Sequence, residues 1–267
     1  MSVALHADDL GLHPAVDRAV LQAFEAGAVA GASILVGGPS FREAARQARS
    51  AGLPLSLHLA IVDTQPLSPP AEIPSLVDAA GRFPPYYGQV LRRGLTGRLP
   101  AAELRREVRR QLEAFAEAGL IGPAGLTVDG HQHLHLLPAV FGLLLELGPT
   151  FGLRAFRLPV LSPHERREWT LRALAFFGAE LLGRWARHRA ARRGVRATPC
   201  WGVLYTGHLT VERARAVLGS LPPGANGQLL CHPGDDDRAL AAARPWGYAW
   251  ETELATALTL AAERSGR

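Results

Sequence analysis

Short apolar runs alternate with longer segments in which apolar positions recur every three or four residues. The apolar runs predict strands at residues 3–6, 32–36, 55–59, 126–128, 155–158, 201–205 and 228–231. The longer segments predict helices at residues 14–26, 41–51, 100–118 and 139–147, with further helical runs within 165–193. Alternation of this kind is typical of βα units around a parallel sheet. The pattern therefore predicts an α/β fold.

The helix predicted at residues 14–26 shows this spacing of apolar residues clearly. Its apolar positions would form one buried face: Val16, Val20, Leu21 and Phe24. Gly27 follows directly and is a typical residue for ending a helix.

Residues 63–99 interrupt this pattern, because they are rich in Pro and Gly and show little periodicity. Such a segment predicts a long loop or lid that shapes a substrate site, rather than a linker between domains. Residues 1–267 are therefore expected to form a single domain.

The formal net charge of +5 says little about partners, because all 29 basic residues are Arg and none is Lys, which points to coding bias. The densest basic run, residues 184–196, has neither interleaved aromatic residues nor a groove-reading motif. It is interpreted as a solvated helix face, and no nucleic-acid partner is expected.

Two further features concern the cellular compartment. No apolar run approaches the roughly 18 residues that a membrane span needs, and acidic residues come too early for a signal peptide. Cys200 and Cys231 are too few for a disulfide framework. A cytoplasmic protein with reduced thiols is expected.

Four polar clusters follow predicted strands: Asp8-Asp9, His58, the run 129–135 (DGHQHLH) and His232. In parallel α/β barrels, the carboxyl ends of the strands lie at one face, where active sites assemble. These clusters are therefore expected to converge on one pocket.

Adjacent carboxylates beside apolar sequence repel each other and are costly to desolvate, and a bound cation would resolve both problems. If Asp9 binds a metal ion, Asp8 on the other side of the backbone can act as general base. The alternative is that one of them caps the helix near Pro14 or binds the turn at Gly11.

His58 alone would be typical of a buried core residue, but His131, His133 and His135 alternate and would share one strand face. Metal binding explains why such a face would be buried. Imidazoles and a carboxylate suit Zn²⁺, other transition metals or, less well, Mg²⁺. Two imidazoles with one carboxylate leave positions open for water, as catalysis requires.

Six other residues are candidates near this site, and two of them, His133 and His135, could bind substrate or support the metal ligands. His232 could protonate a leaving amine, and Asp129 could orient a metal-binding histidine. Arg154 and Arg157 flank a strand end and could bind substrate oxygens or orient the base, unless they are simply solvated.

Four segments in this order, HADDLG, SLHL, DGHQHLH and CHPG, resemble the motifs of the YdjC-like carbohydrate deacetylases. The resemblance runs through most of the chain. It implies an irregular (β/α) barrel of mainly parallel strands, like those of polysaccharide deacetylases and glycoside hydrolases. It also implies one divalent metal ion and hydrolysis of N-acetyl groups on chito-oligosaccharide-like sugars.

The family pattern, transferred to matching positions, makes Asp9, His58 and His131 the metal ligands. It makes Asp8 the base and His232 the acid. A homodimer is also implied, although no heptad or apolar patch in the sequence establishes one.

Residues 30–41 and 57–83 look like the branch of the family that is associated with hopanoid lipid biosynthesis. A glycolipid headgroup is therefore an alternative substrate, and a catalytically silent sugar-binding barrel is an alternative of another class. The departures from the family pattern are at His6, Leu10, Ser56 and Trp250. They leave every expected ligand intact, so they bear on substrate contacts.

Overall fold

A computed structural model describes residues 2–96, 98–168 and 170–265. In this part of the chain, seven parallel strands close into a barrel in chain order. They are β1 (Ser2–Leu10), β2 (Gly31–Ile34), β3 (Leu55–Leu59), β4 (Leu126–Gly130), β5 (Leu153–Pro159), β6 (Arg196–Trp201) and β7 (Asn226–Cys231). The expected (β/α) barrel is confirmed.

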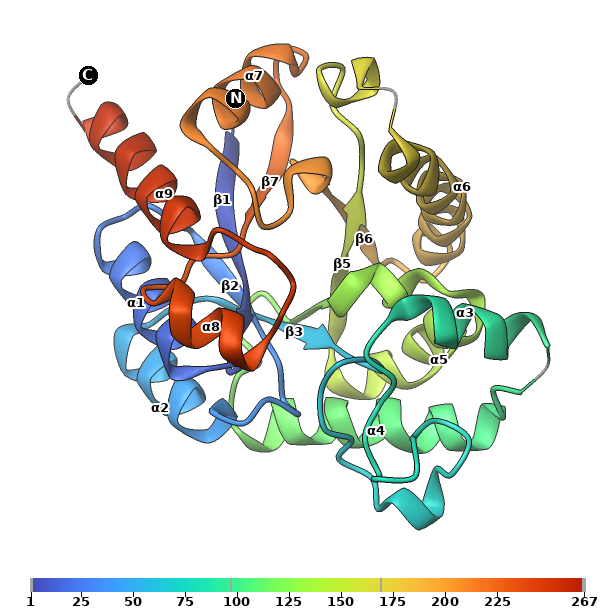
Figure 1. The fold of residues 1–267 in the computed structure, drawn as a ribbon. Coiled ribbons are helices and arrows are strands. Elements are labelled where there is room, and N and C mark those ends of the chain that lie inside the picture. The colour runs from blue at the N-terminus through green and yellow to red at the C-terminus, as the bar shows by residue number, and fades with distance from the viewer. Residues whose placement is uncertain (1, 97, 169, 266–267) are drawn as a thin grey trace.

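Helices surround the barrel, and both termini lie at the same end of it (Figure 1). The α-helices are α1 (Pro14–Glu25), α2 (Phe41–Ala51), α3 (Tyr87–Leu95), α4 (Ala101–Glu117), α5 (Pro138–Leu147), α6 (Leu171–Ala191), α7 (Val211–Ser220), α8 (Asp237–Ala243) and α9 (Trp250–Ser265).

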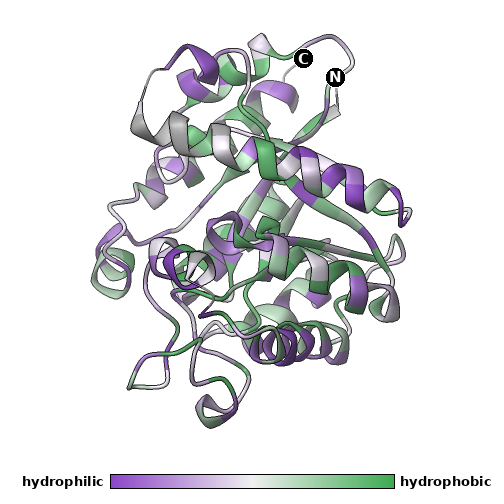
Figure 2. Cartoon of the chain, turned by 90° about the vertical axis from the view of Figure 1, so that its right-hand side faces the viewer, coloured by the Kyte–Doolittle hydropathy of each residue, from purple (hydrophilic) through white to green (hydrophobic). Residues whose placement is uncertain are grey.

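The strands are apolar because helices cover the outside of the barrel and side chains fill its interior. All four residues of β2 are buried, and so are the last four of β3. Figure 2 shows the same arrangement, with hydrophobic strands at the centre and mixed hydrophilic and hydrophobic helices around them. The sequence pattern found α2 and β3 at their observed bounds, because α2 buries one face and β3 is an apolar run that is buried along nearly its whole length.

The expected strand at 201–205 is wrong. The strand is β6, which ends at Trp201, and Val203–Tyr205 forms a 3₁₀ turn. β6 begins with the exposed Arg196 and has partly exposed residues before Cys200, so a search for apolar runs selects the buried turn after it.

The segment 63–99 is not a plain loop, since it contains a 3₁₀ turn (Pro70–Glu72) and α3. The fully buried Glu107 of α4 accepts the backbone N–H groups of Leu67 and Ser68 at 3.0 and 2.9 Å. Glu103 accepts the N–H of Ser75 at 2.8 Å. Carboxylates of α4 thus hold a segment that has little apolar periodicity.

The connection from β1 to α1 depends on Asp17, which accepts the backbone N–H of Gly11 at 2.7 Å. Gly11 has a φ of +87°, in the left-handed region that favours glycine. Asp17 is 4% exposed, and burial raises the pKa of its carboxyl to about 6, although the N–H of Gly11 opposes this. A buried carboxyl therefore shapes the turn that follows Asp8 and Asp9.

No helix in the described part of the chain combines the length and the apolar character that crossing a membrane requires. The large apolar side chains that are exposed there are Tyr86, Tyr87 and Leu181. The homodimer stays a prediction.

We expect Asp17→Asn to make unfolding less sensitive to pH. A carboxyl with a folded pKa of about 6 and an ordinary value of 3.8 binds more protons when folded, so its contribution to stability falls as pH rises through this window. The stability of Asp17→Asn relative to the parent should therefore increase from pH 4 to pH 7, by up to about 3 kcal/mol. Urea unfolding at several pH values measures the difference.

Asp78→Asn is the matched control. Backbone N–H groups of Arg82 and Ala80 lower the pKa of the Asp78 carboxyl, so the pH trend for this variant should have the opposite sign. A relative stability of Asp17→Asn that does not change with pH would contradict the prediction.

Candidate metal centre

Asp8 and Asp9 lie at the carboxyl end of β1, where the pairing with β2 shifts register between Ala7 and Leu10. Asp9 has a φ of +68°, which breaks the alternation of a regular strand. Both carboxylates therefore face His58, whose Nε2 lies 3.4 Å from Asp9 Oδ1 and 4.0 Å from Asp8 Oδ2. The expectation that Asp8 lies on the other side of the backbone is wrong.

Asp9, His58 and His131 meet at one point, although they come from β1, β3 and the end of β4. Asp9 Oδ1 lies 3.4 Å from His58 Nε2 and 3.1 Å from His131 Nδ1. One ligand atom from each residue lies within 4.8 Å of the other two, and all three side chains are buried. Asp9 Oδ1 has no hydrogen-bond partner among the described residues, so these short contacts lack hydrogen-bond alignment.

This geometry fits a divalent metal ion. Bonds of about 2.1 Å, separated by the angles of octahedral or tetrahedral coordination, place neighbouring ligand atoms about 3.0–3.4 Å apart. The distances from Asp9 Oδ1, 3.1 and 3.4 Å, lie in that range. A cation would also satisfy the buried oxygen that has no hydrogen-bond partner.

The opposite nitrogen of His58 is already engaged. Its Nδ1 lies 2.6 Å from Asp129 Oδ1, which leaves Nε2 with a lone pair for a cation. The other oxygen of Asp129 accepts the Ser33 hydroxyl at 2.5 Å and lies 2.7 Å from Arg157 Nη2. Although burial opposes ionisation, Arg157 and His58 hold the pKa of Asp129 well below its ordinary value.

Arg157 is 1% exposed and lies between two carboxylates. Its Nη1 donates to Asp8 Oδ2 at 2.5 Å, its Nη2 contacts Asp129, and its Nε donates to Gln228 at 3.0 Å. His6, Asp8 and Asp129 also have the spacing of a metal site, but this guanidinium already supplies a cation to both carboxylates. Asp8 Oδ1 has no partner among the described residues.

The centre has an excess of negative charge. Asp8, Asp9 and Asp129 all have lowered pKa values, so three carboxylates face one guanidinium and leave two negative charges, as long as the imidazoles are neutral. Burial disfavours a charged imidazole, yet Asp8 and Asp129 raise the pKa of His58 to about 10. A divalent cation would balance this charge without protonating a ligand.

The run HQHLH does not form the expected strand face. After β4 it makes a 3₁₀ turn, in which Gln132 and His133 have φ values of +52° and +58°. His135 turns back over Gly130, where an added Cβ would lie 2.7 Å from the ring, and hydrogen-bonds to the Arg157 carbonyl at 2.8 Å.

The three histidines therefore have different surroundings. Only His131 reaches Asp9. His133 lies against Phe176, with ring centroids 5.7 Å apart, and burial lowers its pKa to about 3.

Arg154 is apart from the centre, which corrects the expectation for this residue. It is exposed and is the second residue of β5, near the start of β4, whereas the centre lies at the opposite end of these strands. Arg157 lies three residues further along β5 and points into the barrel. Their odd spacing puts the two side chains on opposite faces of the strand, but the sequence alone did not show which face lines the barrel interior.

His232 follows β7 and lies over the buried Glu253 of α9, whose carboxylate accepts the backbone N–H of His232. The same carboxylate lies 3.6 Å from His232 Nδ1. Burial disfavours the imidazolium, but Glu253, Asp9 and Asp8 together raise the pKa of His232. Three carboxylates thus favour the protonated form of this ring over burial, which opposes it.

Other residues near the centre were missed by sequence analysis. Asp63 has a φ of +55°, and its Oδ2 lies 3.8 Å from His131 Nε2, with neither atom hydrogen-bonded among the described residues. Asp63 directly follows the apolar run that holds His58. Its place at the end of that run was the one feature of the sequence that could have identified it. Trp246 lies 5.5 Å from His131, between ring centroids.

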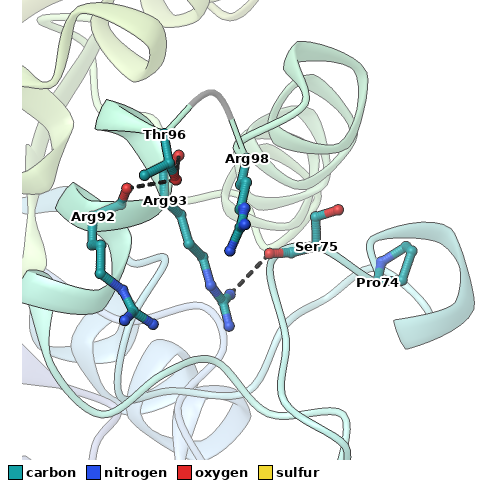
Figure 3. A pocket seen from close by; sticks show the side chains of 6 residues that line it. All are labelled: Pro74, Ser75, Arg92, Arg93, Thr96 and Arg98. Atoms are coloured by element: carbon teal, nitrogen blue, oxygen red, sulfur yellow. Dashed lines mark hydrogen bonds between the residues drawn. The ribbon is translucent and has the colours of Figure 1, made fainter.

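A separate hollow of about 570 Å³ lies at the end of α3 (Figure 3). It is lined by Pro74, Ser75, Arg92, Arg93, Thr96 and Arg98. None of these residues belongs to the metal centre, and Arg93 is held there by donating to the Ser75 carbonyl at 2.8 Å.

We expect Arg157→Met to destabilise the fold by about 3–5 kcal/mol, because it leaves Asp8 and Asp129 buried without their cation. Urea unfolding measures this loss. Arg18→Met is the control, since it removes an exposed pair with Asp235 and should have little effect. Equal, small effects of both variants would contradict the prediction.

Comparisons with known proteins agree with this architecture. The human carbohydrate deacetylase is 32% identical to this chain over 247 residues, which cover 88% of this chain and 75% of the human protein. A chitooligosaccharide deacetylase of Serratia marcescens is 30% identical over 150 residues, which cover 56% of each protein.

The fold is also found in a crystal structure of an Enterococcus faecalis protein named for cellobiose-phosphate cleavage. It superposes with a TM-score of 0.71 at 22% identity and covers 99% of this chain and 95% of its own. The family model described as YdjC-like protein matches residues 2–264. This chain therefore belongs to the YdjC-like family.

Proposed function

We propose that this protein is a metal-dependent hydrolase that removes the acetyl group from an N-acetylated amino sugar of the chito-oligosaccharide type. The observation that carries the proposal is the convergence of Asp9 Oδ1, His58 Nε2 and His131 Nδ1, with Asp8 beside them. Relatives named as carbohydrate and chitooligosaccharide deacetylases support the substrate class.

A divalent ion held by Asp9, His58 and His131 would supply Lewis-acid polarisation of the acetyl carbonyl and of a water molecule. Nitrogen donors favour Zn²⁺ or another transition metal over Mg²⁺. Asp129 would keep His58 in the tautomer that binds metal through Nε2, because it occupies Nδ1.

Asp8 is the proposed general base. Arg157 holds one of its oxygens, while Oδ1 has no protein partner among the described residues and can accept the proton of the attacking water. Arg157 also lowers the pKa of Asp8, which keeps the carboxylate ionised before the reaction, although burial opposes ionisation.

His232 is the proposed general acid. Its raised pKa favours the protonated ring that a leaving amine needs, and Glu253 holds the backbone of His232 with its carboxylate 3.6 Å from Nδ1. Nε2 is then the atom that can donate to the amide nitrogen as the C–N bond breaks.

Asp8→Asn and Asp9→Asn should separate the two carboxylate roles. Asp9→Asn should lose both bound metal and activity, whereas Asp8→Asn should keep the metal and lose turnover by about 10²- to 10⁴-fold. Elemental analysis after dialysis measures the metal, and acetate release from N,N′-diacetylchitobiose measures turnover. Glu43→Gln, which changes an exposed carboxylate on α2, is the control and should change neither.

A fully active Asp8→Asn enzyme would overturn the assignment of the base. Acetate release from glycolipid extracts, but not from N,N′-diacetylchitobiose, would favour the glycolipid alternative. Sugar binding without any acetate release would favour the catalytically silent barrel.

Metal removal should also lower thermal stability, because two buried negative charges lose their counter-ion. Addition of Zn²⁺ at about 100 times its dissociation constant should restore about 2.7 kcal/mol. Thermal unfolding of chelator-treated protein, with and without Zn²⁺, checks this. His131→Ala should respond little to Zn²⁺, whereas the exposed-site control His188→Ala should respond like the parent. An identical response of all three proteins would exclude binding at this centre.

A further inference from the structure

Two aromatic side chains from the connection between α8 and α9 border the candidate centre. The ring centroid of Trp246 lies 5.5 Å from that of His131, and the ring of Tyr248 lies 5.2 Å from His232. The two aromatic rings are 5.2 Å apart. Together they reach from a proposed metal ligand to the proposed acid.

The packing behind these rings holds them in position. Trp250 is 1% exposed and lies 6.3 Å from Trp246 and 5.4 Å from Tyr248, between ring centroids. Gly207 has a φ of +78°, and a Cβ there would lie 2.1 Å from the Tyr248 ring. The N–H of Ala249 donates to the Gly207 carbonyl at 2.8 Å, which ties the two segments together.

Trp246 and Tyr248 differ from core aromatic residues, because each keeps part of its surface exposed while Trp250 behind them is buried. His131 and His232 are themselves only 6% exposed. The partly exposed rings therefore offer apolar surface beside the buried centre, where the rest of a sugar can lie once its acetamido group reaches the centre. The C–H face of a pyranose is apolar, so an aromatic ring with a free surface suits it.

We propose that Trp246 and Tyr248 form a binding subsite for an uncharged pyranose ring. Trp246 packs against the C–H face of the sugar, and Tyr248 borders the sugar beside His232, so that the acetamido group points to the centre. The nature of the ligand rests on the proposed function, whereas the subsite itself rests on the positions of the rings.

The test measures sugar binding in the Asp8→Asn background, where the sugar is not consumed. Trp246→Ala should weaken the binding of N,N′-diacetylchitobiose about tenfold in calorimetry. Trp246→Phe should retain most of the affinity but lose the sugar-dependent change in tryptophan fluorescence. Trp185→Phe, which replaces an indole packed on Phe141 by a phenyl ring, is the matched control and should keep both.

In the otherwise unaltered enzyme, Trp246→Ala should raise KM, while kcat and metal content stay close to those of the parent. Gly207→Ala displaces Tyr248 without changing any residue of the subsite, so it should also weaken sugar binding. Thermal unfolding reports whether this variant is folded. If Gly207→Ala does not fold, Trp246→Ala alone decides the outcome.

Parental sugar affinity in Trp246→Ala would overturn the inference, even if the enzyme releases acetate. Loss of metal in this variant would also overturn it, since Trp246 would then support the centre rather than the sugar. If the protein binds the sugar through Trp246 but never releases acetate, the proposed function fails and the subsite stands.

Discussion

Three carboxylates buried at one end of a barrel make up the interaction on which the rest of this structure depends. Asp8, Asp9 and Asp129 are each at most 3% exposed, and charges this deep are tolerated only when they are paired. Arg157 neutralises part of the charge from inside the barrel. The remaining charge lies where His58 and two unpartnered carboxylate oxygens can receive a cation. The same buried negative charge thus makes the fold depend on Arg157 and makes the site suitable for a cation.

The barrel positions these groups because parallel strands present their carboxyl ends at one face. β1 supplies the two adjacent carboxylates, β3 supplies the imidazole, and β4 supplies the carboxylate that orients it. The left-handed conformation of Asp9 brings its carboxylate to the same side as that of Asp8. Without that local break, one carboxylate would point away from the candidate metal centre.

Helix α9 and the connection before it place further residues at this end of the barrel. Glu253 on α9 holds His232 through its backbone, and the connection before α9 carries Trp246 and Tyr248 to the same edge. Both aromatic residues lie after residue 193, where the apolar pattern predicted no helix. The proposed acid and the proposed subsite therefore depend on α9 and on the connection before it, which the apolar pattern did not predict.

The sequence by itself determined the fold class, most strands, and the convergence of the polar clusters that contain Asp9, His58 and His131, whereas the resemblance to the family selected these three as ligands. Apolar alternation reports burial directly, and charged residues after buried strands are costly unless they serve a site. Tertiary structure alone decided which arginine enters the barrel, since Arg154 and Arg157 lie on opposite faces of β5 and barrel closure determines which face is the interior. Tertiary structure also decided the backbone conformation of the turn at 131–136 and of Asp63. Left-handed conformations at non-glycine residues arise from packing and leave no periodic pattern in the sequence.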